Sequence, residues 1–574
     1  METTTIKWAL QEQKPEQCAI IARALNMSPL VAQLLINRGI DTPEQAELFL
    51  AARLQDLHSP FLMKNMDTAV ARVLEALNKK EKICVYGDYD VDGITASASM
   101  YLFLRELAAD AVCYIPDRLT EGYGLNPEAI KRIASQGVRL IITVDCGISD
   151  YAEVAFAREK GIDVIVTDHH EVPDTIAPAH AVINPKQADC PFPFKGLAGV
   201  GVAFNLIMAI RKTLRDRDVW SEGQEPNLKR YLDLVAMGTI ADIVPMVDEN
   251  RILVRNGLEV ISEGKRPGVK ALKSFCGISS GEVTANMVGY RMAPRINSCG
   301  RMSNALTSFQ LLTAPDTNTA FQLARKVDEE NTRRQQVGKR ILAQSRAMVD
   351  ESSPLPAALI LASEGWNQGV IGICASRLSE TFTRPVILIA IDEKKGEGRG
   401  SARSIAGFDI YSAIKQCAPV LKAFGGHRGA AGMTVDIKNL AAFKQLFSEI
   451  AQQHLTADDF VPSLNIDTQI SLGQLSYDIL EEIESLAPFG TANPEPIFSS
   501  RDIANFSSMT VGNGHLKLKI KENDTFFDAI GFNMAPHYSL GDDPISLAFV
   551  PQFNYFNGEK VVQLNLRDIK TTPT

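Results

Sequence analysis

The sequence predicts an α/β protein with a parallel-sheet domain, a helical connector, a second α/β domain and a C-terminal β-barrel of the OB type. Three observations predict this class. Apolar strands alternate with helical stretches in the first part of the chain, which is typical of a parallel sheet with right-handed crossovers. A second alternation of this kind begins near Pro356. The final part of the chain holds short strands in which polar and apolar residues alternate.

Length and composition are those of a multidomain globular protein. At about 150 residues for each domain, the 574 residues make about three or four domains. A hydrophobic share of 45% is sufficient for large cores. The nine cysteines are scattered and form no Cys-x-x-Cys pair. We therefore expect buried, reduced thiols in a cytoplasmic protein, with neither disulfides nor a zinc site.

The net charge of −9 argues against a protein that coats nucleic acid with its whole surface. It is compatible with a local basic channel, because bound cations would neutralise part of any acidic cluster. No apolar stretch approaches the roughly 20 residues of a membrane span. No long apolar core follows Lys7 and Lys14. We therefore expect no membrane contact and no signal peptide.

Changes in pattern divide the chain into five predicted regions. They are a helical N-terminal lead-in at 1–55, the first α/β domain at 56–245, a helical region at 246–350, the second α/β domain at 351–458 and the barrel at 459–574. In the first α/β domain we expect strands at 82–87, 111–115, 138–144, 162–167 and 180–183. The helices expected there are 94–108, 127–135, 151–159, 200–215 and 227–238.

The sequence also predicts the secondary structure of two later stretches. Leu323–Met348 is predicted to form a connector helix, because it is long, contains no proline and has Gly338 as its only glycine. Its many charges are expected to lie mostly on a solvated face. In the second α/β domain, Ala357–Ala362 and Pro385–Ala390 have the composition of strands, with a helix between them at Gly369–Ser379.

The barrel is predicted from its turns and its aromatic residues. Asn513-Gly514 and Asn557-Gly558 are hairpin signals, and His515–Lys521 alternates between polar and apolar residues. Barrels of the OB type bind single strands by stacking bases on aromatic rings. For any single ring, however, a place in the barrel core is the favoured interpretation. The rings concerned are Phe506, Phe526, Phe527, Phe532, Phe549, Phe553, Tyr555 and Phe556.

Three aspartates on alternate residues, Asp88, Asp90 and Asp92, follow the predicted strand at 82–87. Carboxylates at this density repel one another, so a divalent cation is expected to hold them together; a solvated acidic turn is the alternative. Ligands of an open α/β sheet bind at the carboxyl ends of its strands. Alternation along an extended segment predicts that Asp90 and Asp92 point the same way, toward the ions. Asp88 would be a direct or an outer ligand.

Later segments end in the same classes of residue. Asp145-Cys146-Gly147 follows the strand at 138–144, Asp168-His169-His170 follows the strand at 162–167, and Asp242 closes the apolar run that begins at Ala236. Hard oxygen ligands with imidazoles suit Mn²⁺ or Mg²⁺ better than a thiolate-rich zinc site does. Four segment ends with the same classes of residue are hard to explain as unrelated polar residues on the surface.

These motifs resemble those of the DHH phosphoesterase superfamily. The four that carry the resemblance are Gly87–Gly93, Asp145–Gly147, Asp168–His170 and Gly238–Asp242. Three later motifs look like those of the bacterial single-strand-specific 5′→3′ exonucleases of this superfamily: Arg295–Met302, Gly400–Ser404 and Gly425–His427. The resemblance runs from about residue 50 to the final barrel. Val91 and Ser298-Cys299 depart from the family pattern, and neither position is an expected ligand.

The resemblance implies a two-metal site that holds two Mg²⁺ or Mn²⁺ ions. It assigns the ligand set Asp88, Asp90, Asp92, Asp145, His169 and Asp242. Asp145 would bridge the ions, Asp168 would orient a histidine, and His170 would contact the scissile phosphate. All of these ligands except Asp88, together with His170, are the expected catalytic residues. Two ions can activate a water and stabilise both the attacking and the leaving oxygen of a phosphodiester.

The resemblance also implies a set of phosphate-binding residues. A glycine pair lets backbone N–H groups approach an anion closely, and arginine and histidine add donors. For an arginine in a loop, a structural ion pair is the alternative. The set is Arg118, His170, Arg301, Arg377, Ser401, Arg403, Gly425, Gly426 and His427.

The implied activity is metal-dependent 5′→3′ degradation of single-stranded DNA to 5′-mononucleotides by two-metal hydrolysis, in recombinational and mismatch repair. The implied partners are single-stranded DNA, single-stranded-DNA-binding protein and a RecQ-type helicase, with the enzyme a cytoplasmic monomer. One alternative is a DHH phosphodiesterase acting on short oligonucleotides or cyclic dinucleotides. The connector and barrel argue for a polymeric substrate instead. A non-catalytic DHH scaffold is the less favoured alternative, since every expected ligand is present.

Overall fold

The computed structural model describes residues 6–118, 120–221, 223–278, 281–350, 354–523, 525–538, 543–556 and 559–571, with only the backbone at 505–506, 555–556 and 559. The chain forms two compact units. One comprises Met1–Ala9 and Glu329–Leu464, and the other comprises Leu10–Asp328 and Asn465–Thr574. Each unit is described by itself below.

The larger unit contains a parallel five-stranded sheet, as predicted. Its strands lie in the order β3 (Ala111–Tyr114), β2 (Lys82–Gly87), β4 (Val138–Val144), β5 (Asp163–Thr167) and β6 (Ala181–Ile183). Every neighbouring pair is parallel. Side chains alternate between the two faces of β2, so that Ile83 and Val85 join one core while Cys84 and Tyr86 join another.

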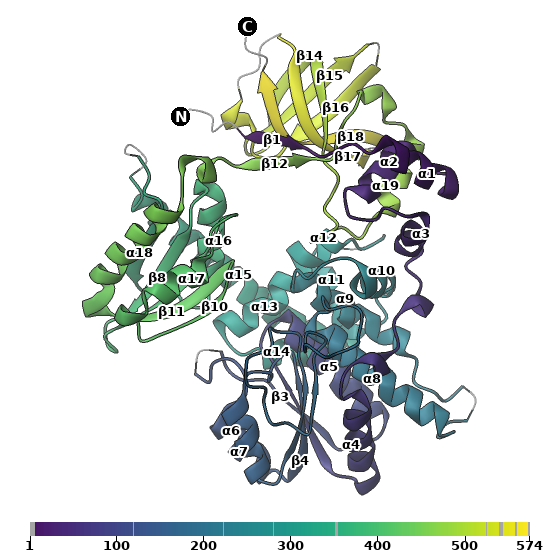
Figure 1. The fold of residues 1–574 in the computed structure, drawn as a ribbon, viewed down its shortest axis with the longest axis vertical. Coiled ribbons are helices and arrows are strands. Elements are labelled where there is room, and N and C mark those ends of the chain that lie inside the picture. The colour runs from purple at the N-terminus through teal and green to yellow at the C-terminus, as the bar shows by residue number, and fades with distance from the viewer. Residues whose placement is uncertain are drawn as a thin grey trace. The chain divides into compact units, whose positions relative to one another are not determined.

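Helices cover both faces of this sheet (Figure 1). One face packs against α4 (Met66–Lys79), α5 (Val91–Glu106) and α8 (Gly199–Asp216). The other packs against α6 (Pro127–Ser135) and α7 (Tyr151–Glu159). Because both faces are covered, the strands are apolar almost throughout.

A helical region follows the sheet. It comprises α9 (Leu232–Ala241), α10 (Asp248–Glu263), α11 (Pro267–Phe275), α12 (Ala285–Met287), the π-helical turn η4 (Val288–Met292), α13 (Ala293–Met302) and α14 (Leu306–Leu312). The connector helix is α15 (Thr317–Ala347), which begins six residues before the predicted start at Leu323. The side chain of Asp316 caps this earlier start, because its Oδ1 accepts a hydrogen bond from the Thr319 backbone N–H at 2.9 Å.

The N-terminal segment is not purely helical. The strand β1 (Lys7–Leu10) pairs with β12 (Ser463–Ile466), and α1 (Pro15–Leu25), α2 (Pro29–Ile36) and α3 (Pro43–Ala51) follow, each with proline at its first turn. In the described part of the chain, no single helix is long and apolar enough to cross a membrane. By length and composition alone, α1 and α2 together would pass as a broken span bent by 115°, but most of α2 is buried in this fold.

The smaller unit contains a mixed sheet with the strand order β10 (Ala423–His427), β11 (Ala430–Asp436), β9 (Glu397–Arg403), β8 (Val386–Asp392) and β7 (Leu359–Glu364). The β7–β8 pair is parallel and joined by the helix α16 (Ile371–Phe382), while the other pairs are antiparallel. The helices α17 (Ile410–Gln416) and α18 (Leu440–His454) complete its core. This is the predicted second α/β domain.

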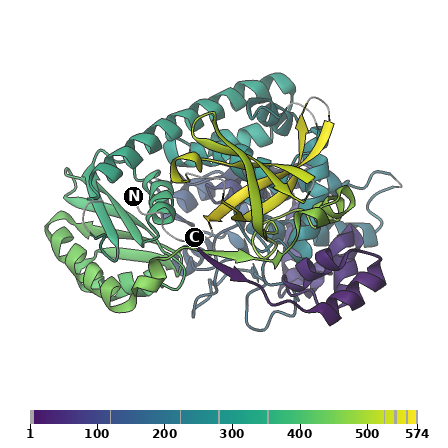
Figure 2. The same ribbon diagram turned by 90° about the horizontal axis from the view of Figure 1, so that it is seen from above.

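The C-terminal strands close into a barrel, seen from above in the yellow-green ribbon of Figure 2. Its strands are β14 (Phe498–Val511), β15 (His515–Glu522), β16 (Thr525–Gly531), β17 (Ile545–Phe556) and β18 (Glu559–Thr571). Pairing of β14 with β17 closes it, and β16 runs parallel to β18. This arrangement confirms the predicted OB-type barrel, and β13 (Thr468–Gln469) extends its sheet.

The barrel aromatics divide between core and surface. Phe527 and Phe549 are buried and Phe553 is half-buried, whereas Phe526 and Phe532 are 45% and 55% exposed. Asn513-Gly514 lies in the β14–β15 turn, as its hairpin signal predicts. Outside the described residues lie the predicted hairpin at Asn557-Gly558 and the side chains of Phe506, Tyr555 and Phe556.

The cysteines agree with the expectation of reduced, buried thiols. No disulfide joins any of the nine, all of which lie within the described residues. Eight are buried and Cys113 is half-buried.

Candidate active site

The carboxyl ends of three neighbouring strands meet at one edge of the parallel sheet. In the register of these strands, Gly87 of β2 lies opposite Val144 of β4, and Val144 lies opposite Thr167 of β5. The next residue in each strand is an aspartate. The parallel register therefore brings Asp88, Asp145 and Asp168 to the same edge, where the ligand of an open α/β sheet binds.

The side chains at this edge form overlapping groups of potential metal ligands. Within each group the ligand atoms lie within 4.8 Å of one another. The groups are Asp88 with Asp90 and Asp145, Asp92 with His169 and Asp242, and Asp145 with His169 and His170. Asp145 therefore belongs to two of these groups.

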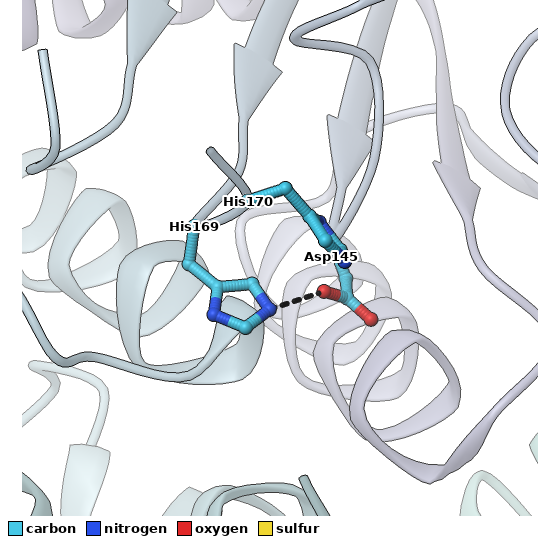
Figure 3. A group of neighbouring side chains, drawn as sticks. All are labelled: Asp145, His169 and His170. Carbon is cyan, nitrogen blue, oxygen red and sulfur yellow. Dashed lines mark ion pairs between the residues drawn. The ribbon is translucent and has the colours of Figure 1, made fainter. Parts of the chain in front are cut away.

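His169 lies between these carboxylates. Its Nε2 is 3.2 Å from Asp145 Oδ1, 3.5 Å from Asp242 Oδ2 and 3.9 Å from Asp92 Oδ2. Figure 3 shows this nitrogen turned toward the carboxylate of Asp145. A nitrogen and three carboxylates at these distances could together bind a cation.

The extended segment from which the orientation of Asp90 and Asp92 was predicted does not form, although both residues belong to potential ligand groups. The strand β2 ends at Gly87, and α5 already begins at Val91 rather than at the predicted residue 94. Asp90 caps this helix, its side chain accepting a hydrogen bond from Gly93 N–H at 3.1 Å. Successive helical residues turn by about 100° instead of the 180° of a strand. Asp90 therefore joins Asp88, while Asp92 joins the group on the other side.

The N-terminus of α8 holds Asp92 in place. Gly199 N–H donates to Asp92 Oδ2 at 2.6 Å, and Val200 N–H donates to Oδ1 at 2.8 Å. The partial positive charge of a helix N-terminus favours a carboxylate here. A Cβ at Gly199 would lie 2.5 Å from Asp145 Oδ1, so glycine is needed for the helix to come this close. Sequence reasoning did not identify Gly199; its position at a helix start was the only signal.

Two backbone features limit which residues can occupy positions 145 and 238 of the site. Asp145 has φ of +62°, a left-handed conformation that is unfavourable for a residue other than glycine, asparagine or aspartate. Gly238 lies where a Cβ would come within 2.9 Å of Asp92 Oδ1. Residues other than glycine in the left-handed region are concentrated at functional sites.

The pKa values of four of these aspartates are raised. Burial, followed by the neighbouring charges, raises the pKa of Asp92 to about 7 and that of Asp242 to about 9. The same causes raise the pKa values of Asp88 and Asp145 well above the ordinary range. Burial and the charge of His170 lower the pKa of His169 to about 4, so this imidazole is neutral.

The site meets the chemical test for a divalent cation. Among the described residues, Asp88 Oδ1, Asp145 Oδ1 and His169 Nε2 are buried atoms without a hydrogen-bond partner. Buried polar atoms are almost always hydrogen-bonded, so these three require another partner. Oxygen atoms with one or two imidazole nitrogens are the donor set of Mg²⁺ and Mn²⁺. The residues present therefore fit such ions.

His170 is held by the aspartate two residues before it. Asp168 Oδ1 accepts from His170 Nδ1 at 2.7 Å, and its two oxygens also accept backbone N–H groups, among them that of Ile148. Burial would lower the pKa of His170, but the hydrogen bond and charge of Asp168 raise it to about 9. Despite its burial, the pKa of Asp168 is lowered by the same pair. The pair fixes Nδ1 of this imidazole, which is 45% exposed.

Tyr123 is a site residue that sequence reasoning missed. Its hydroxyl lies 3.2 Å from His170 Nδ1 and donates to the Asp145 carbonyl at 3.3 Å. The ring is 47% exposed beside the metal-ligand groups. The flanking Gly122 and Gly124 both have positive φ, and this Gly-Tyr-Gly loop was the available signal.

Two of the predicted phosphate-binding arginines lie beside Tyr89. In the sequence, Tyr89 stands between the ligand candidates Asp88 and Asp90. Arg118 stacks on the Tyr89 ring, with Cζ 5.0 Å from the ring centroid. Burial and Asp88 raise the pKa of Tyr89 to about 12, against the opposing charges of Arg118 and Arg301. The structure therefore brings both arginines next to the first ligand group.

The smaller unit gathers other predicted phosphate-binding residues. Arg403 donates to Ser401 Oγ and to Ser376 Oγ, both at 3.1 Å. A Cβ at Gly372 would lie 2.8 Å from Ser401 Oγ, so this glycine lets the start of α16 approach the pair. Arg377 is exposed on the same helix. A serine, an arginine and a helix N-terminus together are typical of an anion site.

The predicted phosphate-binding glycine pair lies in an edge strand. Gly425, Gly426 and His427 belong to β10 and pair with β11. The turn comes later, where Gly429 N–H donates to His427 Nδ1 at 3.2 Å. Gly426 is required by the pairing, since a Cβ there would lie 2.5 Å from the Ala430 carbonyl oxygen. All three residues are exposed on the outer edge of the sheet.

Comparison with known proteins identifies the family. Family models match residues 82–239 (DHH family, N-terminal domain), 356–453 (DHHA1 domain) and 466–568 (RecJ OB domain). The single-stranded-DNA-specific exonuclease RecJ of Bacillus subtilis is 37% identical over 572 residues, covering 99% of this chain and 71% of that protein. The chain belongs to the RecJ family. The predicted resemblance is thereby confirmed.

Solved RecJ structures have the same fold. The Mn²⁺ complex of RecJ from Thermus thermophilus superposes with a TM-score of 0.86 at 29% identity, covering 100% of this chain and 81% of that one. Its Mg²⁺ complex gives a TM-score of 0.78 at 28% identity, with 99% and 79% coverage. The predicted fold class of a DHH domain, a connector, a DHH-associated domain and an OB barrel is confirmed.

Proposed function

We propose that this chain is a metal-dependent 5′→3′ exonuclease that degrades single-stranded DNA to 5′-mononucleotides in DNA recombination and repair. Its RecJ relatives are named single-stranded-DNA-specific exonucleases. The observation that carries the mechanism is the placement of Asp145, which belongs to two of the groups of potential ligands, one with Asp88 and Asp90 and one with His169 and His170. Such sharing is what a bridging carboxylate between two ions requires.

The proposed cofactors are two ions, either Mg²⁺ or Mn²⁺. One structure of the Thermus relative is a complex with Mn²⁺ and another is a complex with Mg²⁺. Asp88, Asp90 and Asp145 would hold one ion, and Asp92, His169 and Asp242, with Asp145 as the shared ligand, would hold the other. When bound, such ions activate water and stabilise charge on both oxygens of an in-line displacement.

The protein's own groups would orient the scissile phosphate. Because Asp168 occupies Nδ1 of His170, Nε2–H is the donor available to a phosphate oxygen. The helix N-terminus holds Asp92 in its orientation, and Gly199, which lacks a Cβ, lets this helix start lie close to Asp145. Tyr123 then limits the movement of the imidazole from the exposed side.

The 5′ end would be held by phosphate-binding residues. In the larger unit, Arg118 and Arg301 beside Tyr89 support binding of a terminal phosphate. In the smaller unit, Ser401 and Arg403 of β9, beside the start of α16, support a second group of donors. Further candidates on exposed surfaces are Arg377, Gly425, Gly426 and His427. Recognition of a 5′-terminal phosphate would set the direction of degradation.

The barrel supports a substrate longer than a dinucleotide. A groove of about 430 Å³ on the barrel is lined by Tyr477, Lys519 and Phe526, among others. Lys519 Nζ lies 5.1 Å from the centroid of the exposed Phe526 ring. A cation beside an exposed ring suits a strand whose bases stack and whose phosphates are charged. We assign catalysis to residues 56–245, phosphate binding also to 351–458, and strand binding to 459–574.

A DHH phosphodiesterase acting on short oligonucleotides or cyclic dinucleotides is the alternative, because the ligand groups alone would serve either substrate. A helicase of the RecQ type and single-stranded-DNA-binding protein are proposed partners, since the substrate must first be exposed as a single strand. We propose that the enzyme acts in the cytoplasm as a monomer.

The test uses single-stranded DNA labelled at either end, with Mg²⁺ or Mn²⁺. We expect the 5′ label to be released first, as a mononucleotide, and Asp145→Asn to abolish release while the circular dichroism spectrum is unchanged. Oligonucleotide products from internal sites would contradict an exonuclease. Faster turnover of a dinucleotide than of a long strand would favour the alternative.

A further inference from the structure

A tight turn lies between the helical segment before the barrel and its first long strand. Residues Pro488–Glu495, here called the strap, fold back on themselves: Gly490 N–H donates to the Asn493 carbonyl at 2.8 Å, and Asn493 N–H donates back at 3.1 Å. The fully buried Asn493 side chain donates to the Leu486 and Pro488 carbonyls, each at 2.9 Å. These bonds make the strap a rigid element.

The strap is anchored from several directions within the larger unit. Arg38 donates to Asn493 Oδ1 at 2.8 Å and to the Pro494 carbonyl at 2.6 Å. Glu495 accepts from Asn286 Nδ2 and pairs with Arg567 of the barrel, both at 2.9 Å. The N-terminal helices, the helical region and the barrel therefore all fix the position of this turn.

The tip of the strap meets the segment that follows the metal-ligand candidate Asp242. Thr491 Oγ1 donates to the Ile243 carbonyl at 2.9 Å, and Met246 N–H donates to the Thr491 carbonyl at 2.7 Å. A Cβ at Gly490 would lie 3.3 Å from the Met246 side chain. One residue, Thr491, thus bonds to both ends of Ile243–Met246.

Ile243 has an unusual conformation. It follows Asp242, the C-cap of α9, and has φ of +60°, at a position where glycine or asparagine is the usual residue. A β-branched side chain is especially unfavourable in this region, and the Ile243 side chain is 74% exposed, so burial does not compensate it. An outside contact must hold this backbone, and the Thr491 hydroxyl makes a hydrogen bond to it.

We propose that Thr491 is a positioning residue of the metal centre: by fixing the strained Ile243 backbone it holds Asp242 against His169. The proposal rests on the metal centre proposed above. Asp242 Oδ2 lies 3.5 Å from His169 Nε2, and the backbone of its neighbour Ile243 accepts the hydrogen bond. The contact also means that a segment joined to the barrel sets the geometry of a ligand in the DHH domain.

The test measures binding of Mn²⁺ alone to the full chain by titration calorimetry. Thr491→Val should weaken Mn²⁺ binding about 2- to 10-fold, which corresponds to the loss of one hydrogen bond. Thr491→Ser keeps the hydroxyl and should bind as the parent does. Thr319→Val is the matched control, because it removes another threonine hydroxyl, which bonds to Asp316 at 2.8 Å.

A second variant tests the role of strain. Glycine tolerates positive φ without help. Ile243→Gly combined with Thr491→Val should therefore restore the Mn²⁺ affinity that Thr491→Val alone loses. Unchanged affinity in Thr491→Val, equal loss in Thr491→Ser, or no recovery in the double variant would each overturn the proposal. A chain that binds Mn²⁺ in this Thr491-dependent way but releases no nucleotide would contradict the proposed function and leave the positioning role intact.

Discussion

Gly199→Ala should disable the site without removing any polar group. An alanine Cβ would lie 2.5 Å from Asp145 Oδ1 and 2.7 Å from the Asp145 Cβ, whereas ordinary contacts begin at 3.4 Å. The first of these distances must increase by about 0.9 Å, the difference between 3.4 and 2.5 Å. Both sides of the clash carry ligands, because the start of α8 holds Asp92 and Asp145 is the opposing residue.

Neither side can move without displacing a ligand. Asp145 is fixed by its left-handed backbone and by its N–H bond to the Thr167 carbonyl at 2.9 Å. Misplacement of a reacting group by about 1 Å costs on the order of 100-fold in rate. We therefore expect kcat to fall on the order of 100-fold, with overpacking reducing stability by about 1–3 kcal/mol.

The assay is single-turnover release of nucleotide from 5′-labelled single-stranded DNA, with thermal unfolding measured in parallel. Gly201→Ala is the matched control, two residues further along the same helix. The three atoms nearest to its Cβ would all belong to the Leu197 side chain, the first being Cδ2 at 3.1 Å, and the end of that side chain can move. Parental activity in Gly199→Ala, or an equal loss in Gly201→Ala, would refute the reasoning.

Three further predictions follow from the structure. Asp168→Asn should lower kcat about 10- to 100-fold, because Asp168 orients His170; an unchanged single-turnover rate would contradict this role. Phe526→Ala should weaken binding of a long single strand by about 1–3 kcal/mol in fluorescence titrations, whereas Phe532→Ala, an exposed barrel ring outside the groove, should not; equal effects would argue against stacking at Phe526. Burial raises the pKa of Glu249 from its ordinary value of 4.5 to about 7. Above pH 4.5 the unfolded chain releases this proton more readily than the folded protein does, so the stability present at lower pH is lost as the pH rises through about 7. Glu249→Gln should therefore gain stability relative to the parent over this range, by on the order of 3 kcal/mol at pH 8 in denaturant unfolding, and a gain that is independent of pH would refute the assignment.

The sequence was sufficient to predict the sheet and the place of the site. Strand periodicity and the aspartates that follow Gly87, Val144 and Thr167 are local features. In a parallel sheet, local features determine which residues reach the carboxyl edge, because equal register places strand ends side by side. The motifs that resemble the DHH superfamily lie on these same residues, so fold and family were both accessible before the structure.

The tertiary structure alone decided how the site is assembled. Asp90 and Asp92 separate into different groups because a helix cap turns the chain where an extended segment was expected. Asp92 is held by backbone N–H groups more than 100 residues away in the chain, and Thr491 reaches Ile243 across 248 positions. These contacts depend on how distant segments pack. The direction of a side chain in such packing cannot be predicted from the local pattern of polar and apolar residues. Residue classes and strand ends therefore predicted which groups meet, whereas tertiary packing determined which way each of them points.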